Sequence, residues 1–589
     1  MELHQRIVSA PVDFGAIRSE FGLASAYPAE ATAAARDAID AFAGARADRT
    51  DIPFVTIDPP GAMDLDQAVH IEHTSSGFTV HYAIADVGAV IDPAGPLAQE
   101  AGARGQTFYL PDGTVPLHPP ILSENSASLL PDQTRPAALW TIECDENAEP
   151  RRFSVIRATV RSRARLDYAS VQADADAKRL HPSIAALPEF GKRRIEAGLA
   201  RGAIGLRLPA QSVIRDDKAV GHWRLVVEPR TAADDWNEQI SLLTGMCAAR
   251  IMLNGTGSDD APNVGERIAL LRTMPPPADS AIDSMRRTAA ALGVDWPADQ
   301  SVGRMLAGLD PNAPATLVLM SEATGLLRGA GYTVLDGAVA GANGSGVGAQ
   351  SADGARSAGG AGAAGGAGLE GNSRSAGYSE SLGGAGSRGG TGSPGRVGSV
   401  GGVGTSGGTG ADGGKGSANS RGAVGNAGSV GGGRTNARPP SNPQTVNNLQ
   451  HSAIGAPYAH VTAPLRRLAD RFATEICLAR CAGTEVPQWV RDGLVPTAES
   501  MKRSDSLAGK VERACIDLTE STLLAERSGA IFEAVVVREA NGTRPAEVFI
   551  ADPPVVGPCI GAPPEGEQVQ VRLVAADPTT RKISFGYPI

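Results

Sequence analysis

The sequence predicts an α+β protein that ends in a small β-barrel of the OB type. Stretches with strand character come first, within residues 54–143. Helical periodicity follows in three later stretches, and short strands return after residue 530. Strands and helices that are grouped along the chain, instead of alternating, are typical of α+β folds. A length of 589 residues is enough for several domains.

Residues 1–50 are rich in alanine and charged residues. They predict a helical N-terminal segment that is too small to be a stable domain of its own. Three strands are predicted next, because β-branched and aromatic residues lie between turn residues. These strands cover residues 54–57, 78–84 and 138–143.

Three helices are predicted further along the chain. Residues 236–253 carry apolar side chains at the spacing of one helix face, which indicates a packed helix. These side chains are Ile240, Leu243, Met246, Cys247 and Ile251. Residues 465–482 and 501–527 show a similar helical pattern.

The C-terminal stretch changes character again. Alternating or apolar runs occupy residues 532–537, 546–550 and 568–574, and a turn at 577–582 leads into 583–585. Short strands joined by tight turns over about 60 residues are typical of a small OB-fold barrel.

Residues 341–441 are dominated by Gly, Ser and Ala, with few large apolar residues. Such a tract loses more chain entropy on ordering than its small side chains could recover. We therefore expect a flexible insertion that acts as a spacer. Weak RNA contact through its scattered arginines is the alternative.

Composition limits the function classes. The formal net charge of −10 argues against broad, non-specific binding to polyanions, although a local basic channel is compatible with it. No apolar run is long enough to span a bilayer, and the N-terminus lacks the apolar region of a signal peptide. The six cysteines are scattered without C-x-x-C spacing, so we expect reduced thiols and a cytoplasmic protein.

Three aspartates lie close together directly after the first predicted strand. Asp58, Asp64 and Asp66 fall within one turn-rich loop. Carboxylates this close raise one another's pKa unless a cation compensates, and hard oxygen ligands favour Mg²⁺ or Mn²⁺. The loop therefore predicts a metal site for phosphoryl transfer. The alternative is a solvated acidic turn.

Six arginines crowd residues 151–165, and alternation along a strand would put several of them on one face. They predict either part of an RNA path or a strand edge protected by charge. The arginines are Arg151, Arg152, Arg157, Arg161, Arg163 and Arg165.

Four blocks, taken in order, resemble the ribonuclease II and ribonuclease R family, whose RNB domain degrades RNA from its 3′ end. The first is the aspartate loop. The second is Tyr-Ala-Ile-Ala-Asp-Val at 82–87 followed by residues 104–116, and the third is Trp-Asn-Glu-Gln-Ile-Ser-Leu-Leu at 236–243. The fourth is Tyr-Ala-His-Val-Thr-Ala-Pro-Leu-Arg-Arg at 458–467.

The resemblance implies an RNB catalytic domain with a mixed sheet surrounded by helices, interrupted by the Gly-rich insertion. The expected divisions are a helical segment, the first part of the RNB domain, the insertion, its second part and an RNA-binding barrel. They cover residues 1–50, 51–340, 341–441, 442–528 and 529–589.

The resemblance also implies roles for single residues. Asp58, Asp64 and Asp66 would surround Mg²⁺, or Mn²⁺, and the scissile phosphate, with Asp66 most closely tied to cleavage. Gln67 stands where the family has a fourth aspartate, and its carbonyl oxygen could still be a weak, neutral metal ligand.

A second group would contact the nucleic acid. Arg466 would grip the cleaved phosphate, and Arg467 is its basic neighbour. Tyr109 would stack on a base near the 3′ end, and a half-buried core tyrosine is the alternative.

The predicted function is hydrolysis of single-stranded RNA from the 3′ end to nucleoside 5′-monophosphates. Its partner would be single-stranded RNA, with no membrane and no obligate protein partner. Two alternatives stay open: a non-catalytic RNA-binding protein weakened by Gln67, and a metal-dependent phosphodiesterase acting on DNA.

Overall fold

A computed structural model of the chain describes residues 9–206, 210–228, 230–255, 266–310, 313–338 and 449–589. The predicted insertion at 341–441 lies outside these residues. Within them we find no helix with the length and hydrophobicity that a bilayer crossing requires. All six cysteines lie in the described part, and all are free thiols.

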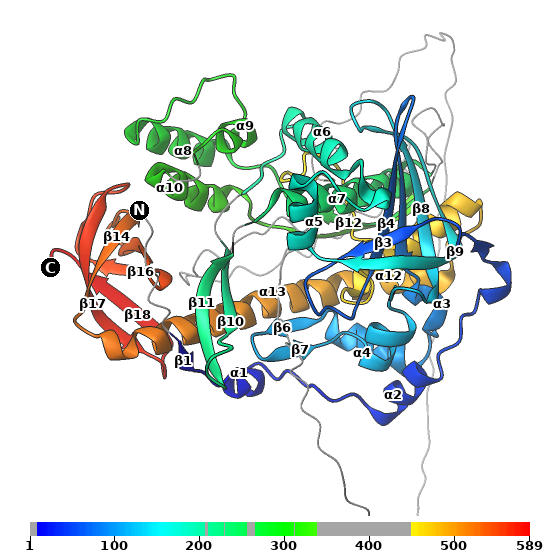
Figure 1. Cartoon of the computed structure of the whole chain (residues 1–589), viewed down its shortest axis with the longest axis horizontal. Coiled ribbons are helices and arrows are strands. Elements are labelled where there is room, and N and C mark those ends of the chain that lie inside the picture. The colour runs from blue at the N-terminus through cyan, green and yellow to red at the C-terminus, as the bar shows by residue number, and fades with distance from the viewer. Residues whose placement is uncertain (1–8, 207–209, 229, 256–265, 311–312, 339–448) are drawn as a thin grey trace, which may run out of the picture. The chain divides into compact units, whose positions relative to one another are not determined.

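The main sheet has six strands in the order β2-β9-β3-β4-β5-β8 (Figure 1). Because β8 also pairs with β9, five of these strands follow one another in a closed circuit of pairings. The strands are β2 (Ala47–Asp48), β3 (Phe54–Ile57), β4 (Gln67–Thr74), β5 (Gly77–Ala85), β8 (Thr134–Cys144) and β9 (Pro150–Leu166).

Two long helices cover this sheet and share its core. Side chains of α7 (Ala232–Asn254) and α12 (Leu468–Ala482) pack with buried residues of β3, β4, β5, β8 and β9 in one apolar cluster. Thr231 caps the start of α7: its side chain accepts from the N–H of Asp234, and the Asp234 side chain accepts from the N–H of Thr231. The core therefore fixes the end of β3 and the start of α12 relative to each other.

Smaller elements surround this core. The helices are α1 (Gly15–Glu20), α2 (Ala29–Arg36), η1 (Ala43–Ala45), α3 (Val87–Val90), α4 (Pro96–Arg104), η2 (Leu122–Ser126), α5 (Tyr168–Asp176), η3 (Pro182–Ile184) and α6 (Leu187–Ala200). The strands form three small antiparallel sheets: β1 (Ala10–Pro11) with β11 (His222–Glu228) and β10 (Ala210–Arg215), β6 (Phe108–Leu110) with β7 (Gly113–Val115), and β12 (Glu266–Thr273) with β13 (Gly331–Ala338).

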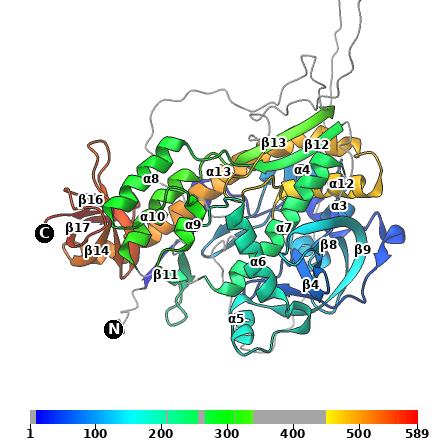
Figure 2. The same ribbon diagram turned by 90° about the horizontal axis from the view of Figure 1, so that it is seen from above.

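A group of short helices lies between β12 and β13 in the sequence and has its own apolar cluster. Figure 2 shows these helices together, with α10 against β14 of the C-terminal barrel. They are α8 (Asp279–Ala291), α9 (Val302–Ala307), α10 (Pro314–Ala323) and η4 (Thr324–Leu326).

The C-terminal strands close a barrel in the order β14-β15-β16-β18-β17, with one parallel pairing between β16 and β18. This five-stranded barrel confirms the predicted OB-type end of the chain. Its strands are β14 (Ile531–Arg538), β15 (Ala546–Ala551), β16 (Pro554–Ile560), β17 (Gln568–Asp577) and β18 (Lys582–Gly586).

One long helix, α13 (Gln488–Leu524), contacts both the elements around the main sheet, such as α12 and α4, and the barrel. In Figure 1 it runs from the region of α12 to β17 and β18. The 3₁₀ turn η5 (Ala525–Arg527) then leads into β14.

Several expected element bounds were wrong. The helix expected from residue 465 begins at Leu468, because the preceding residues are held in a loop. The helix expected from residue 501 begins at Gln488 and continues through Pro496. Strand β16 was not expected, since Pro554, Gly557 and Pro558 interrupt its strand pattern.

Candidate active site

The aspartate loop leaves the sheet at the end of β3 and returns to it at the start of β4. The N–H of Asp58 donates to the carbonyl of Leu166 on β9 at 3.0 Å, which continues the parallel pairing by one residue. The hydroxyl of Ser128 donates to the carbonyl of Met63 at 2.6 Å and accepts from the N–H of Leu65 at 3.0 Å. Sequence reasoning did not identify Ser128, because a buried serine has no motif.

Asp66 and Arg466 meet although they are 400 residues apart in the sequence. Oδ1 of Asp66 accepts from the N–H of Leu465 at 2.7 Å, and Oδ2 lies 3.8 Å from Nε of Arg466. The Asp66 side chain is buried, and Arg466 is partly exposed. A charge fixed in this way is preorganised, because the fold holds it before any substrate arrives.

Burial disfavours the charged form of all three aspartates. Burial, with the charge of Asp64 as a second cause, raises the pKa of Asp58 to about 7. Burial also raises the pKa of Asp64, and it raises that of Asp66 well above its ordinary value. The Arg466 guanidinium lowers all three pKa values, yet it does not compensate for the loss of water.

Tyr109 of β6 lies near Arg466, Asp64 and Asp66. Burial, followed by the charge of Asp64, raises the pKa of its hydroxyl, while a hydrogen bond with Arg466 opposes that shift. The carbonyl of Arg466 accepts from the N–H of Thr107 at 3.0 Å, so the strand that carries Tyr109 also holds the arginine. The structure thus brings Tyr109, Arg466 and the three aspartates together.

Gln67 and Arg467 are engaged with the protein. Nε2 of Gln67 donates to the carbonyl of Thr462 at 2.7 Å, and its Oε1 accepts from the hydroxyl of Tyr82. Arg467 makes two hydrogen bonds of 3.0 Å to the carboxylate of Asp470 in the first turn of α12. The predicted roles of Gln67 as a metal ligand and of Arg467 in RNA binding stay predictions.

One observation favours a divalent cation at this site. Oδ2 of Asp58 is buried without a hydrogen-bond partner, and a buried carboxylate oxygen without a partner is costly unless an ion or a proton compensates. In the described part of the chain, no three His, Cys, Asp or Glu side chains form a ready-made cluster for a metal. The metal site predicted at Asp58, Asp64 and Asp66 therefore stays a prediction, in which water and substrate would supply further ligands.

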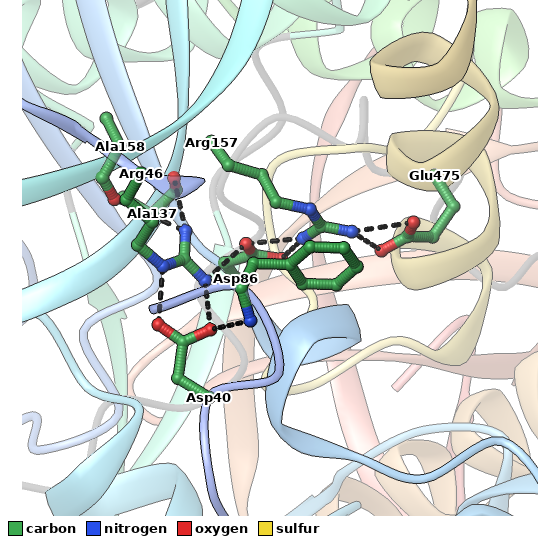
Figure 3. Close-up of polar contacts among 8 residues, drawn as sticks. Asp40, Arg46, Asp86, Ala137, Arg157, Ala158 and Glu475 are labelled. Carbon is green, nitrogen blue, oxygen red and sulfur yellow. Dashed lines mark hydrogen bonds and ion pairs between the residues drawn. The ribbon is translucent and has the colours of Figure 1, made fainter. Parts of the chain in front are cut away.

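Figure 3 shows a largely buried network of ion pairs between the N-terminal segment, the main sheet and α12. Asp86 follows β5 and pairs with Arg46 at 2.9 Å and with Arg157 at 2.5 Å, and Arg157 also pairs with Glu475 of α12 at 2.6 Å. Asp40 pairs with the far side of Arg46 at 2.5 Å. The network links the N-terminal segment, the sheet and α12, so it fixes the helix that directly follows Arg466.

The arginines of residues 151–165 make contacts within the protein, and a part in an RNA path stays a prediction. Residues 150–157 of β9 pair with β8 alone, whereas β2 and β3 pair only within residues 158–166. Arg157 belongs to the buried network, and Arg165 donates to the carbonyl of Ala62 in the aspartate loop at 3.0 Å. The others pair with Asp145, Glu143, Asp132 and the carbonyl of Thr50.

Two family models match the chain. The RNB domain matches residues 46–318, and the RNase II-type exonuclease C-terminal S1 domain matches residues 530–587. Together these stretches make up more than half of the chain.

Curated relatives match a shorter part. Ribonuclease R of Escherichia coli is 29% identical over 262 residues, which are 43% of this chain and 31% of that protein. The exosome complex exonuclease RRP44 of Mus musculus is 27% identical over 259 residues, which are 43% of this chain and 26% of that protein. The matched region thus spans about a third or less of these relatives.

Solved structures show the same fold. The apo form of Mycoplasma genitalium RNase R has a TM-score of 0.69 at 16% identity and covers 97% of this chain and 77% of its own. Yeast Ssd1, a pseudonuclease, has a TM-score of 0.54 at 14% identity and covers 91% and 52%. The two domain models match in the expected order, so the chain carries an RNB domain followed by an RNase II-type C-terminal S1 domain.

Proposed function

We propose that the chain is a 3′ to 5′ exoribonuclease that hydrolyses single-stranded RNA to nucleoside 5′-monophosphates with a divalent metal ion. One observation carries the proposal. The Asp66 carboxylate accepts from the N–H of Leu465 at 2.7 Å and lies 3.8 Å from Nε of Arg466, although 400 residues separate Asp66 from Arg466. The Arg466 guanidinium also lowers the pKa of Asp58, Asp64 and Tyr109. Carboxylates beside a guanidinium and an aromatic ring suit hydrolysis of the last phosphodiester bond of a single strand.

The relatives support RNA as the substrate class. Mycoplasma genitalium RNase R has been solved in complex with ribose methylated single-stranded RNA and with double-stranded RNA. The C-terminal barrel of the present chain matches an S1 domain, and OB-type barrels bind single strands through a groove and stacking side chains.

In this proposal Asp58 and Asp64 hold the metal, and Asp66 acts closest to the scissile bond. When bound, Mg²⁺ or Mn²⁺ lowers the pKa of a water molecule and neutralises charge on the phosphate. Side chains of the protein would accept the proton and hold the phosphate. Asp66, fixed by the Leu465 N–H, is positioned to accept a proton from the attacking water.

Arg466 is the group that holds the phosphate. Its guanidinium lies beside Asp66 and is partly exposed, so it is open to an incoming oxygen. A planar guanidinium stabilises the charge that develops on phosphate oxygens better than an ammonium group does. Tyr109, next to Arg466, would hold the terminal base by stacking, which contributes about 1–3 kcal/mol per base.

Loss of catalysis is the main rival, and two observations favour it. A pseudonuclease shares the fold, and Gln67 replaces a carboxylate that the family resemblance implies. We favour an active enzyme because the three aspartates remain and Arg466 lies beside Asp66.

The test is a digestion ladder. Pure protein is incubated with a single-stranded RNA labelled at its 5′ end, with Mg²⁺, with Mn²⁺ or with EDTA, and with a DNA oligomer of matched sequence in parallel. We expect a ladder that shortens from the 3′ end, nucleoside 5′-monophosphate as the product, and no reaction in EDTA.

Other outcomes decide between the rivals. RNA binding without shortening in either metal would support the pseudonuclease. Equal rates on RNA and DNA would support a general phosphodiesterase, since preference for RNA requires a contact to the 2′-hydroxyl.

A further inference from the structure

The segment that carries Arg466 is held almost entirely through its peptide groups. We call residues 462–468 the arginine loop. Its first four residues are buried, whereas Arg466 and Arg467 are partly exposed. A buried peptide group must find a partner, so the contacts of this loop determine its shape.

Partners from three parts of the chain hold the loop. The N–H of Ala463 donates to Asp470 at 2.7 Å, and the N–H of Leu465 donates to Asp66 at 2.7 Å. Further along, the carbonyl of Arg466 accepts from the N–H of Thr107, and the N–H of Leu468 donates to the carbonyl of Gly105 at 2.9 Å. The first peptide group in the loop, the carbonyl of Thr462, accepts from Nε2 of Gln67 at 2.7 Å.

The side chain of Gln67 is held in turn by Tyr82 and Ser241. The hydroxyl of Tyr82 donates to its Oε1 and lies 3.0 Å from the hydroxyl of Ser241 on α7. Oγ of Ser241 also lies 3.4 Å from the same Oε1. Tyr82 is 1% exposed, so its hydroxyl has no access to bulk water and depends on these partners.

These contacts fix the orientation of the amide group. The Thr462 carbonyl is an acceptor only, so it requires the NH₂ of Gln67 and not its oxygen. A flipped amide would set two oxygens against each other and would remove the acceptor of the Tyr82 hydroxyl. The oxygen that could bind a metal is therefore already committed to Tyr82 and Ser241.

We infer that Gln67 is a positioning residue that holds the arginine loop against Asp66, and that the metal site is built without it. The inference rests on the proposed function, because it concerns how that site is held. A carboxylate at this position could not donate to Thr462 and would meet no positive charge from Tyr82 or Ser241. Gln67 therefore replaces the fourth carboxylate with a neutral amide that can hold the Thr462 carbonyl, and we call this contact the clamp.

The test compares Gln67→Ala, Gln67→Glu and Tyr82→Phe with the full-length wild type. Hydrogen exchange read by mass spectrometry reports on the arginine loop without requiring activity. In both Gln67 variants we expect exchange of the loop amides to rise roughly three- to tenfold, as the loss of one hydrogen bond implies. Tyr82→Phe removes only the anchor, so we expect a smaller rise in the same direction.

Two further measurements distinguish a positioning role of Gln67 from a role as metal ligand. The clamp predicts that kcat on RNA falls about tenfold in Gln67→Ala, while the dissociation constant for Mn²⁺, measured by titration calorimetry without RNA, changes less than about twofold. Gln99→Ala is the matched control, since Gln99 also donates to a backbone carbonyl, that of Ala94, but is exposed.

The contrary result would be equally clear. If Gln67→Ala weakened Mn²⁺ binding severalfold and left loop exchange unchanged, Gln67 would be a ligand and the inference would be wrong. A wild type that cleaves no RNA would refute the proposed function alone, because loop exchange and Mn²⁺ binding would still test the clamp.

Discussion

At the scale of single residues, the site is held by contacts between side chains and peptide groups. Asp66, Asp470 and Gln67 each bind a peptide group of the arginine loop. Side chains fixed in this way lose little further freedom when a substrate binds, which favours a preorganised site. The charges that face the substrate are then set by the fold of the loop.

The first prediction concerns Asp66. Asp66→Asn should lower kcat on RNA at least about a hundredfold, because the amide cannot accept a proton or neutralise the metal. Its oxygen can still accept from Leu465, so we expect the loop to stay in place and the dissociation constant for RNA to stay within about threefold. Single-turnover cleavage and fluorescence anisotropy with a labelled RNA measure the two quantities.

Asp132→Asn is the control for this substitution, because it makes the same change at a carboxylate that is 73% exposed. It should leave both quantities unchanged. Near-normal turnover by Asp66→Asn would remove Asp66 from the chemistry.

At the scale of elements, regular periodicity was predictable and loops fixed by distant residues were not. The span 54–57 was predicted and is β3, and the span 236–253 lies within α7. The start of α12 was misplaced, because partners such as Asp66 and Thr107 are remote in sequence and override the helical pattern of residues 465–467. Local pattern contains no information about such partners.

The residues of the candidate site also fall into those that the sequence indicates and those that depend on distant contacts. The aspartates were singled out because carboxylates clustered in one loop are typical of a site that binds a metal, and Arg466 was singled out only through the family resemblance. The structure brings Asp66 and Arg466 together, and their roles stay predictions. The clamp through Tyr82 and the buried pairing of Arg157 were not, since either side chain has an ordinary role in a strand. Their function depends on contacts that only the folded chain creates.

The second prediction concerns the packing of α3 against α12. Gly88 of α3 lies so close to Glu475 that a Cβ atom would come within 2.1 Å of its Oε1. Gly88→Ala should therefore displace Glu475 from Arg157 and lower the free energy of unfolding by about 1–3 kcal/mol. Denaturant unfolding followed by tryptophan fluorescence measures this loss.

Gly102→Ala on α4 provides the control, because nothing lies within 4 Å of the added Cβ. It should be neutral or slightly stabilising, since alanine has the higher helix propensity. Equal effects of the two substitutions would mean that the ion network in Figure 3 does not hold α12.

At the scale of the whole molecule, a buried contact joins three parts of the chain. Nε2 of Gln211 on β10 donates to Glu520 of α13 at 2.9 Å and to the carbonyl of Pro554 in the barrel at 2.6 Å. Glu520 is 4% exposed. The Gln211 amide thus adds to the contacts between β10, α13 and the barrel, and the Glu520 carboxyl group that it binds has little water around it.

The last prediction follows from the ionisation of that group. Burial raises the pKa of Glu520 to about 8, against opposing effects from Gln211 and Arg513. A carboxyl whose pKa is raised by folding stabilises the protein fully below its ordinary pKa, and this contribution is lost as the pH rises towards 8. The wild type should therefore lose stability between pH 5 and pH 9 as Glu520 becomes charged.

Glu520→Gln keeps the acceptor for Gln211 but cannot ionise. We expect its Tm to match the wild type at pH 5 and to exceed it by about 2–4 °C at pH 9, measured by differential scanning calorimetry. Glu533→Gln is the matched control, because Glu533 also accepts from a glutamine, Gln570, but is exposed. If both variants raised Tm equally at pH 9, general surface charge and not the buried contact would explain the pH dependence.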